Sequence, residues 1–324
     1  MHRSPRPTLL TGLALLAGSP SVVAQAAGPG ARSCASATWS AAQQTVVLLG
    51  GSSTACGVEP ILDGALWGWN GTRWSRIALT GGPGPREDAL LTPGTNSLLL
   101  VGGRRLGTVY QDVWRFADGR WSVVHTVGAS PGRLEHTAGA FDGRRHELVL
   151  FGGALQGAPG RLSRQTALLR DTTWSLHTDA FGPAARIGHG MTWSPDHDGV
   201  LLYGGFAAAG SFRDLWHWNG LRWRLVDSVG PTHIEGPALI TTDSGVVVLG
   251  AGLNAQPGEQ LRAWRWHNNA WHALPGMGPP LRIGQVSTWD PIRRSIVVLG
   301  GNLPNQPASN QVWEYHLGAW TRKQ

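Results

Sequence analysis

The chain has 324 residues, of which 41% are hydrophobic and 15% are charged, so its composition is that of a globular protein and not of a disordered one. The formal net charge of +7 comes almost wholly from arginine, because Lys323 is the only lysine. No run of arginines and lysines exceeds two residues, which excludes a basic tail, and we predict no nucleic-acid partner.

The first 26 residues have the pattern of a signal peptide. Arg3 and Arg6 precede an apolar stretch over residues 9–17 that is too short to span a bilayer. Ala24 and Ala26 place small residues at the two positions that a signal peptidase reads. We therefore predict cleavage after Ala26, a secreted or periplasmic protein, and no stable membrane insertion, because no later segment approaches 18 uninterrupted apolar residues.

The two cysteines, Cys34 and Cys56, fit this expectation. An oxidising compartment would pair them, and closing a loop of about 22 residues would stabilise the fold by roughly 3 kcal/mol. The alternative is a pair of buried free thiols.

Six repeats of about fifty residues fill the rest of the chain. Each contains an apolar run that ends in a glycine pair, at Gly50-Gly51, Gly102-Gly103, Gly152-Gly153, Gly204-Gly205, Gly250 (with Gly252) and Gly300-Gly301. A tryptophan follows each pair at a similar distance, at Trp74, Trp121, Trp174, Trp223, Trp271 and Trp320. This period predicts one small sheet per repeat, stacked into a ring.

The fourth repeat shows four strands, which we call a to d. Residues 188–193 alternate as strand a, and residues 200–203 form the continuous apolar run of a buried strand b. Residues 215–218 and 222–225 alternate on either side of Asn219-Gly220, a strong hairpin signal, and form strands c and d.

The other repeats follow this template. Strand c carries a tryptophan seven residues before the one in strand d, at Trp67, Trp114, Trp216, Trp264 and Trp313. The third repeat has Ala167 at this position, so we expect its strand c to be irregular or shifted. We expect the tryptophans to pack between blades, because they repeat in register with the sheet pattern.

The glycine pairs, the aromatic pairs and openings such as Arg186-Ile187-Gly188-His189 resemble those of the kelch-repeat family. This resemblance implies an all-β, six-bladed β-propeller of four-stranded antiparallel blades, covering residues 27–324 as one domain and closing by packing blade six against blade one. The predicted blades are residues 32–80, 84–128, 132–180, 185–229, 232–276 and 281–324.

The fold also resembles the central domain of galactose oxidase, whose copper chemistry uses tyrosines, histidines and a cysteine cross-linked to tyrosine. Here both cysteines lie in blade one, and only three tyrosines are present. We therefore predict neither a metal nor another cofactor.

Strand direction assigns the connections to two faces. The b–c and d–a loops lie on one, the loop face, and the tight a–b and c–d turns lie on the other, the turn face. The b–c loops are longer, as in residues 52–63, 154–164 and 253–260. Because binding residues concentrate on long loops, we predict that the loop face is the working face. Both cysteines are expected there.

A basic residue recurs where each strand a begins, at Arg32, Arg86, Arg133, Arg186, His233 and Arg282. Acidic residues follow at Asp88, Glu135 and Glu235, and His136, His189 and Gln285 come next. A ring of guanidinium groups suits carboxylates or sugar acids. The alternative is structural, with each arginine bridging neighbouring blades and the acids neutralising it. We take Arg86, Arg133, Arg186, Arg282, His136, His189, Glu135 and Glu235 as candidate ligand-binding residues.

No nucleophile elbow or phosphate-binding loop is present, so we expect a binding scaffold for an unidentified protein or glycan rather than an enzyme. One alternative follows from the family resemblance, since some exported bacterial kelch propellers are sialic-acid mutarotases. Glu135 or Glu235 would then be the acid–base group. A structural envelope protein is a second alternative.

Overall fold

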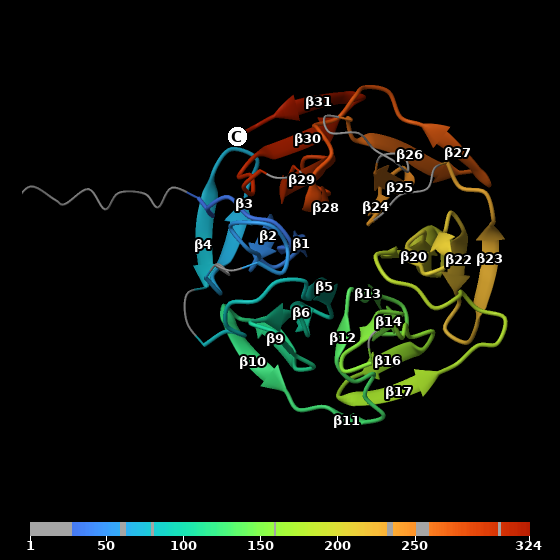
Figure 1. Cartoon of the computed structure of the whole chain (residues 1–324). Helices are drawn as coiled ribbons and strands as arrows, with labels where there is room; N and C mark the ends of the chain where they lie inside the picture. Colours follow the sequence, from blue (N-terminus) through green and yellow to red (C-terminus); the bar gives the residue numbers. More distant parts are fainter. Residues whose placement is uncertain are drawn as a thin grey trace, which may run out of the picture.

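The computed structural model describes residues 28–58, 63–78, 81–158, 160–231, 236–250, 259–303 and 306–324. These residues form six antiparallel sheets arranged radially around one axis, with strand a of each sheet innermost and strand d outermost (Figure 1). The predicted six-bladed β-propeller is therefore confirmed. The predicted signal peptide lies outside the described residues.

The blades are continuous in sequence. Blade one contains β1 (Ser36–Ser40), β2 (Thr45–Leu49), β3 (Leu66–Trp69) and β4 (Trp74–Ala78), and blade two contains β5 (Leu90–Gly94), β6 (Ser97–Val101), β9 (Val113–Ala117) and β10 (Arg120–Val124). Blade three contains β13 (Ala138–Asp142), β14 (Glu147–Phe151), β16 (Thr166–Arg170) and β17 (Thr173–His177), and blade four contains β18 (Gly190–Ser194), β19 (Gly199–Tyr203), β22 (Leu215–Trp218) and β23 (Trp223–Asp227). Blade five contains β24 (Ala238–Thr242), β25 (Gly245–Gly250), β26 (Arg262–His267) and β27 (Ala270–Ala273), and blade six contains β28 (Ile283–Asp290), β29 (Ser295–Asn302), β30 (Val312–His316) and β31 (Ala319–Arg322).

Six apolar clusters fill the spaces between neighbouring blades. In each, residues of strands c and d pack on strand b of the preceding blade, as Trp216, Trp218 and Trp223 pack beside Phe151. Five blades use three aromatic side chains for this contact, and the middle one lies tilted against the strand d tryptophan, as in Trp218–Trp223 with 5.5 Å between ring centroids and 50° between ring planes. The tryptophans thus pack between blades, with a third aromatic position beyond the pair that the sequence indicated.

The ring closes as expected, by blade six packing against blade one without an exchanged strand. One cluster joins Val297, Leu299 and Val312 to Trp67 and neighbouring residues of blade one. The Nε1–H of Trp69 donates to Oε1 of Glu314 at 3.0 Å. The Nε1–H of Trp74 donates to Oε1 of Gln324 at 2.9 Å. Polar bonds therefore reinforce the apolar closure.

Blade three corrects one prediction. Its strand c, β16, is regular and in register, with Ala167 opposite Leu150, so the expected irregularity is wrong. Register depends on the strands on either side, and a small side chain leaves the ladder intact. This blade also has an additional outer strand, β11 (Val127–Gly128), which pairs in parallel with β17.

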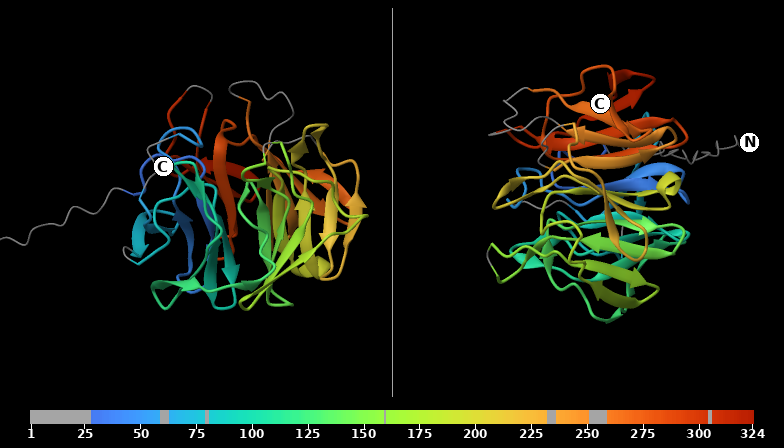
Figure 2. Two further views of the ribbon diagram at one scale, coloured as in Figure 1. Left: turned by 60° about the horizontal axis from the view of Figure 1, so that its bottom comes forward. Right: turned by 90° about the vertical axis from the view of Figure 1, so that its right-hand side faces the viewer.

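The two faces differ as predicted. Two b–c connections on the loop face form short antiparallel hairpins, β7 (Arg104–Arg105) with β8 (Thr108–Val109) and β20 (Phe206–Ala207) with β21 (Gly210–Ser211). In blade three, β15 (Ala154–Leu155) of the b–c connection pairs with β12 (Leu134–Glu135), which lies in the d–a connection before strand a. The turn face has tight turns and one 3₁₀ turn (Pro195–His197). Figure 2 shows the blades running between these two faces.

Candidate functional site

A ring of six residues with left-handed backbone surrounds the axis at the loop face. There is one per blade, before strand a or, in blade six, at the start of β28: Cys34, Asp88, His136, Gly188, Gly236 and Gly284, with φ between 52° and 64°. Four backbone hydrogen bonds join them from blade to blade, with Cys34 N–H donating to Gly284, Asp88 to Cys34, Gly188 to His136 and Gly236 to Gly188, at 2.7 to 3.4 Å. We call these six residues the inner ring.

The inner ring is asymmetric. Blades four to six have glycine, which adopts this backbone freely, whereas blades one to three have Cys34, Asp88 and His136. A side chain in the left-handed conformation costs about 1 kcal/mol or more, and such strain concentrates at functional sites. The inner ring therefore presents side chains in blades one to three only.

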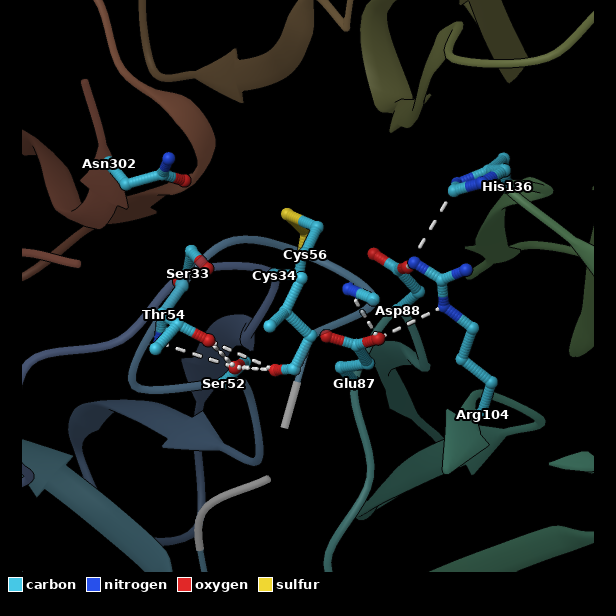
Figure 3. The surroundings of a disulfide bond; sticks show 12 residues. Ser33, Cys34, Ser52, Thr54, Cys56, Glu87, Asp88, Arg104, His136 and Asn302 are labelled. Carbon is cyan, nitrogen blue, oxygen red and sulfur yellow. Dashed lines mark hydrogen bonds and ion pairs between the residues drawn. A yellow bond between two sulfur atoms is a disulfide. The ribbon is translucent and has the colours of Figure 1, made fainter. Parts of the chain in front are cut away.

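Arg104 is at the centre of a charged cluster in this half (Figure 3). Its Nε lies 3.1 Å from Oε1 of Glu87, its Nη2 lies 3.0 Å from Oδ2 of Asp88, and its Nη1 lies 3.5 Å from Oε2 of Glu135. Reciprocal backbone hydrogen bonds between Glu87 and Arg104 hold the two segments together. Three carboxylates around one guanidinium leave this cluster with a net negative formal charge when all are ionised. We call Glu87, Asp88, Arg104, Glu135 and His136 the acidic mouth.

Asp88 and His136 are the inner-ring members of the acidic mouth. Burial raises the pKa of Asp88, although the nearby charges of Arg104 and His136 oppose this shift. Nδ1 of His136 lies 3.9 Å from Oδ2 of Asp88, and this side chain is 40% exposed. The pair therefore places a buried carboxyl group with a raised pKa beside an accessible imidazole.

The disulfide Cys34–Cys56 is formed, as predicted, with 5.6 Å between the Cα atoms. It fastens the b–c loop of blade one to the inner ring. A Cβ atom on Gly284 would lie 2.5 Å from Sγ of Cys56, so only glycine fits there. The N–H of Gly57 then donates to Oε1 of Glu87 at 2.8 Å. The disulfide thus positions one carboxylate of the acidic mouth.

The guanidinium groups of Arg86 and Arg186 face into their own blades. Arg186 is fully buried, and its Nη1 donates to the carbonyl of Gly204 at 2.8 Å and lies 2.6 Å from Oδ1 of Asp214. Arg86 makes the same contacts with Gly102 and Asp112, both at 2.8 Å. Their carbonyl oxygens accept hydrogen bonds from the second glycine of the preceding blade, Gly51 for Arg86 and Gly153 for Arg186. Each arginine therefore braces its blade and joins it to its neighbour.

The carboxylate in this arrangement also holds a tryptophan of strand c. Oδ2 of Asp214 accepts from Nε1–H of Trp216 at 2.6 Å, and Asp112 does the same for Trp114 at 2.7 Å. The signal in the sequence is an aspartate two residues before the strand c tryptophan, which occurs in blades two and four. This Arg–Asp–Trp arrangement was missed in the sequence.

The remaining arginines differ in environment. Arg32 is buried and donates to the carbonyl of Gly50, and burial lowers its pKa to about 10. Nη2 of Arg282 donates to Oε1 of Gln311 at 3.1 Å. Arg133 is exposed, and its side chain has no ion pair or hydrogen bond with the described residues. Arg86 and Arg186 each lie two positions before the inner-ring residue of their blade. In blade three the residue two positions before His136 is Leu134, so Arg133 is not equivalent to these buried arginines.

His189 is buried between blades three and four, with its ring edge-to-face on Phe151 at 5.7 Å. Burial is the main reason that its pKa is lowered to about 3, and the charge of Arg186 acts in the same direction. His189 is therefore neutral at physiological pH. His233 and Glu235 lie outside the described residues.

The described residues contain no group of three or more metal-ligating side chains placed to hold an ion. They also include no helix that is long and apolar enough to cross a membrane.

Comparisons with known proteins identify the fold. No family model matches the chain, and no curated protein matches it by sequence. A solved structure titled "Structure of YjhT" has a similar fold, with a TM-score of 0.67 and 15% sequence identity over 92% of this chain and 99% of that chain. At this identity the likeness shows the β-propeller fold alone.

Proposed function

We propose that the protein is an exported propeller of the kelch type that binds a partner through the acidic mouth on its loop face. The asymmetry of the inner ring is the observation that carries this proposal. Three glycines in equivalent positions demonstrate that the backbone needs no side chain there, yet Asp88 and His136 are present despite the strain. The disulfide supports export, because such bonds persist in oxidising compartments.

The charges favour a partner that presents a cationic group. The carboxylates of the part-exposed Asp88 and Glu135 outnumber the single guanidinium of Arg104, and the buried Glu87 pairs with that guanidinium from inside the blade. The fully buried Arg186 and nearly buried Arg86 point into the blades and are not offered at the surface. An amino sugar, or a lysine or arginine side chain of a protein, matches this charge better than a sugar acid does.

Peptide and glycan arrays probed with the mature chain test this proposal. We expect binding to favour sequences with lysine or arginine, or glycans with free amino groups, and to weaken between 0.05 and 0.5 M salt. Asp88→Gly and His136→Gly delete the side chains at positions where glycine suits the backbone, so each should weaken binding while the protein stays folded.

Asp118→Gly is the matched control, because Asp118 is exposed, has φ of 50° and lies in a c–d turn on the opposite face. It should bind like the wild type. Selection of sialylated or other acidic glycans, or equal binding by wild type and Asp88→Gly, would refute the cationic-partner proposal.

A second candidate is general acid–base catalysis on a sugar, which the raised pKa of Asp88 and its contact with His136 favour. Anomeric exchange opens the sugar ring, so it needs one group to take the proton of the anomeric hydroxyl group and another to give a proton to the ring oxygen as its bond to the anomeric carbon breaks. Anomeric exchange of sialic acid and of glucosamine, followed by proton NMR, tests this candidate. Rates equal to those in buffer for both sugars would eliminate it.

A further inference from the structure

The central channel is a second place where a ligand fits. It encloses about 830 Å³ between the innermost strands, a size typical of pockets for small organic ligands. Its lining runs from His189 and Gln285 near the loop face to Asn96 and Pro195 at the turn face. Of the inner ring, only Gly236 lines the cavity. The cavity therefore lies beneath the inner ring and reaches the turn face.

The wall of this cavity is built from apolar residues, hydroxyl groups, amides and two histidines, His146 and His189. Among the described residues that line it, none is an aspartate, glutamate, lysine or arginine. A charged ligand would lose its hydration here without gaining a partner, so the wall favours an uncharged one. Threonine hydroxyl groups supply polarity, and those of Thr192 and Thr241 bond to each other across two blades at 3.0 Å.

Four of the six blades place an aromatic side chain at the turn-face end of the cavity. Trp39, Trp193 and Trp289 occupy equivalent positions of β1, β18 and β28, opposite the first apolar residue of each strand b, and Phe141 does so in β13. All four are half-buried and line the cavity. The indole N–H groups of these three tryptophans donate no hydrogen bond to any described residue and are not buried. We call these four residues the aromatic collar.

We propose that the channel binds an uncharged saccharide that enters from the turn face through the aromatic collar. An indole offers an apolar face to the C–H side of a sugar ring and an N–H donor to its hydroxyl groups. The three indoles at the turn-face opening supply both kinds of contact. This site is separate from the acidic mouth, which lies at the loop face and is proposed to bind a cationic group, whereas the channel is proposed to bind an uncharged one.

Isothermal titration and saturation-transfer NMR test this proposal with glucose, galactose, mannose, N-acetylglucosamine and maltose, alongside the charged relatives glucosamine and glucuronate. We expect a neutral sugar to bind at least tenfold more tightly than glucuronate, and at least tenfold more tightly than glucosamine in Asp88→Gly, in which the acidic mouth is weakened. Trp289→Leu should weaken that binding at least tenfold. The matched control is Trp313→Leu, which removes an indole of the same blade that does not line the cavity, and unfolding midpoints show whether both variants fold.

The outcomes are distinct. Loss of neutral-sugar binding in Trp289→Leu but not in Trp313→Leu supports the channel site. Loss in Asp88→Gly with none in Trp289→Leu places the sugar at the loop face and overturns the proposal. No binding of any neutral sugar at 50 mM also overturns it, because the channel then holds only water.

Discussion

Arg186 illustrates how one side chain organises a blade. Its guanidinium is fully buried, contacts the carbonyl of Gly204 and both oxygens of Asp214, and lies over the ring of Phe212 at 3.9 Å. The position of this arginine near the loop face is readable in the sequence, but the direction of its side chain is not. Direction depends on Asp214, which lies 28 residues later and is brought close only by the sheet.

Arg186→Met is expected to destabilise the protein by about 3–5 kcal/mol, because it leaves the Asp214 carboxylate without its buried partner. Urea unfolding measures this change. Arg133→Met, which alters an exposed arginine, should shift the free energy of unfolding by less than about 0.5 kcal/mol. Equal effects for the two variants would contradict the bracing role of Arg186.

His189 makes stability depend on pH. Its pKa of about 3 in the folded protein lies below the ordinary value of 6.5, so the unfolded chain binds more protons between these values. Stability should therefore fall as the pH is lowered from about 6.5 towards 3, by up to about 1.4 kcal/mol per pH unit.

His189→Leu removes this contribution. The free energy of unfolding of the wild type minus that of the variant should decrease as the pH is lowered from 7 to 4. A difference that is constant over this range would show that His189 does not titrate as proposed.

At the scale of the element, the segment before strand a determines what the loop face presents. In blade one this segment is joined to the b–c loop by the disulfide, and Gly57 of that loop donates to Glu87. The pairing of the cysteines could be predicted because both are assigned to one face. The acidic mouth could not be predicted, because Arg104 and Glu87 are 17 residues apart and a backbone bridge between two loop segments brings them together.

Removing the disulfide with Cys34→Ser and Cys56→Ser should cost about 3 kcal/mol, from the loop entropy restored to the unfolded chain. Cys34→Gly with Cys56→Ser should recover about 1 kcal/mol of this loss, because glycine relieves the left-handed backbone at position 34.

Thermal or urea unfolding of the two double variants measures the difference. Greater stability of the serine variant than of the glycine variant would show that the backbone at position 34 is not strained.

At the scale of the whole molecule, the ring could be predicted from local pattern. Each apolar run, glycine pair and hairpin turn is short-range information, and six copies leave little choice of architecture. The strand register within a blade and the equivalent positions in different blades are harder to predict from the sequence. Alignment on the nearest basic residue placed Arg133 in the series, whereas the left-handed residue His136 shows that Leu134 is the equivalent position. The missing tryptophan at Ala167 does not make β16 irregular, because the pairing with the neighbouring strands keeps it in register.

The central claim is that a partner binds where the inner ring departs from glycine. Hydrogen exchange of backbone amides, with and without the tightest binder from the arrays, locates that surface directly. We predict protection in residues 54–58, 86–88, 104–108 and 133–136 of blades one to three. Protection confined to the turn face, in residues 95–96, 142–146 and 195–198, would contradict the claim.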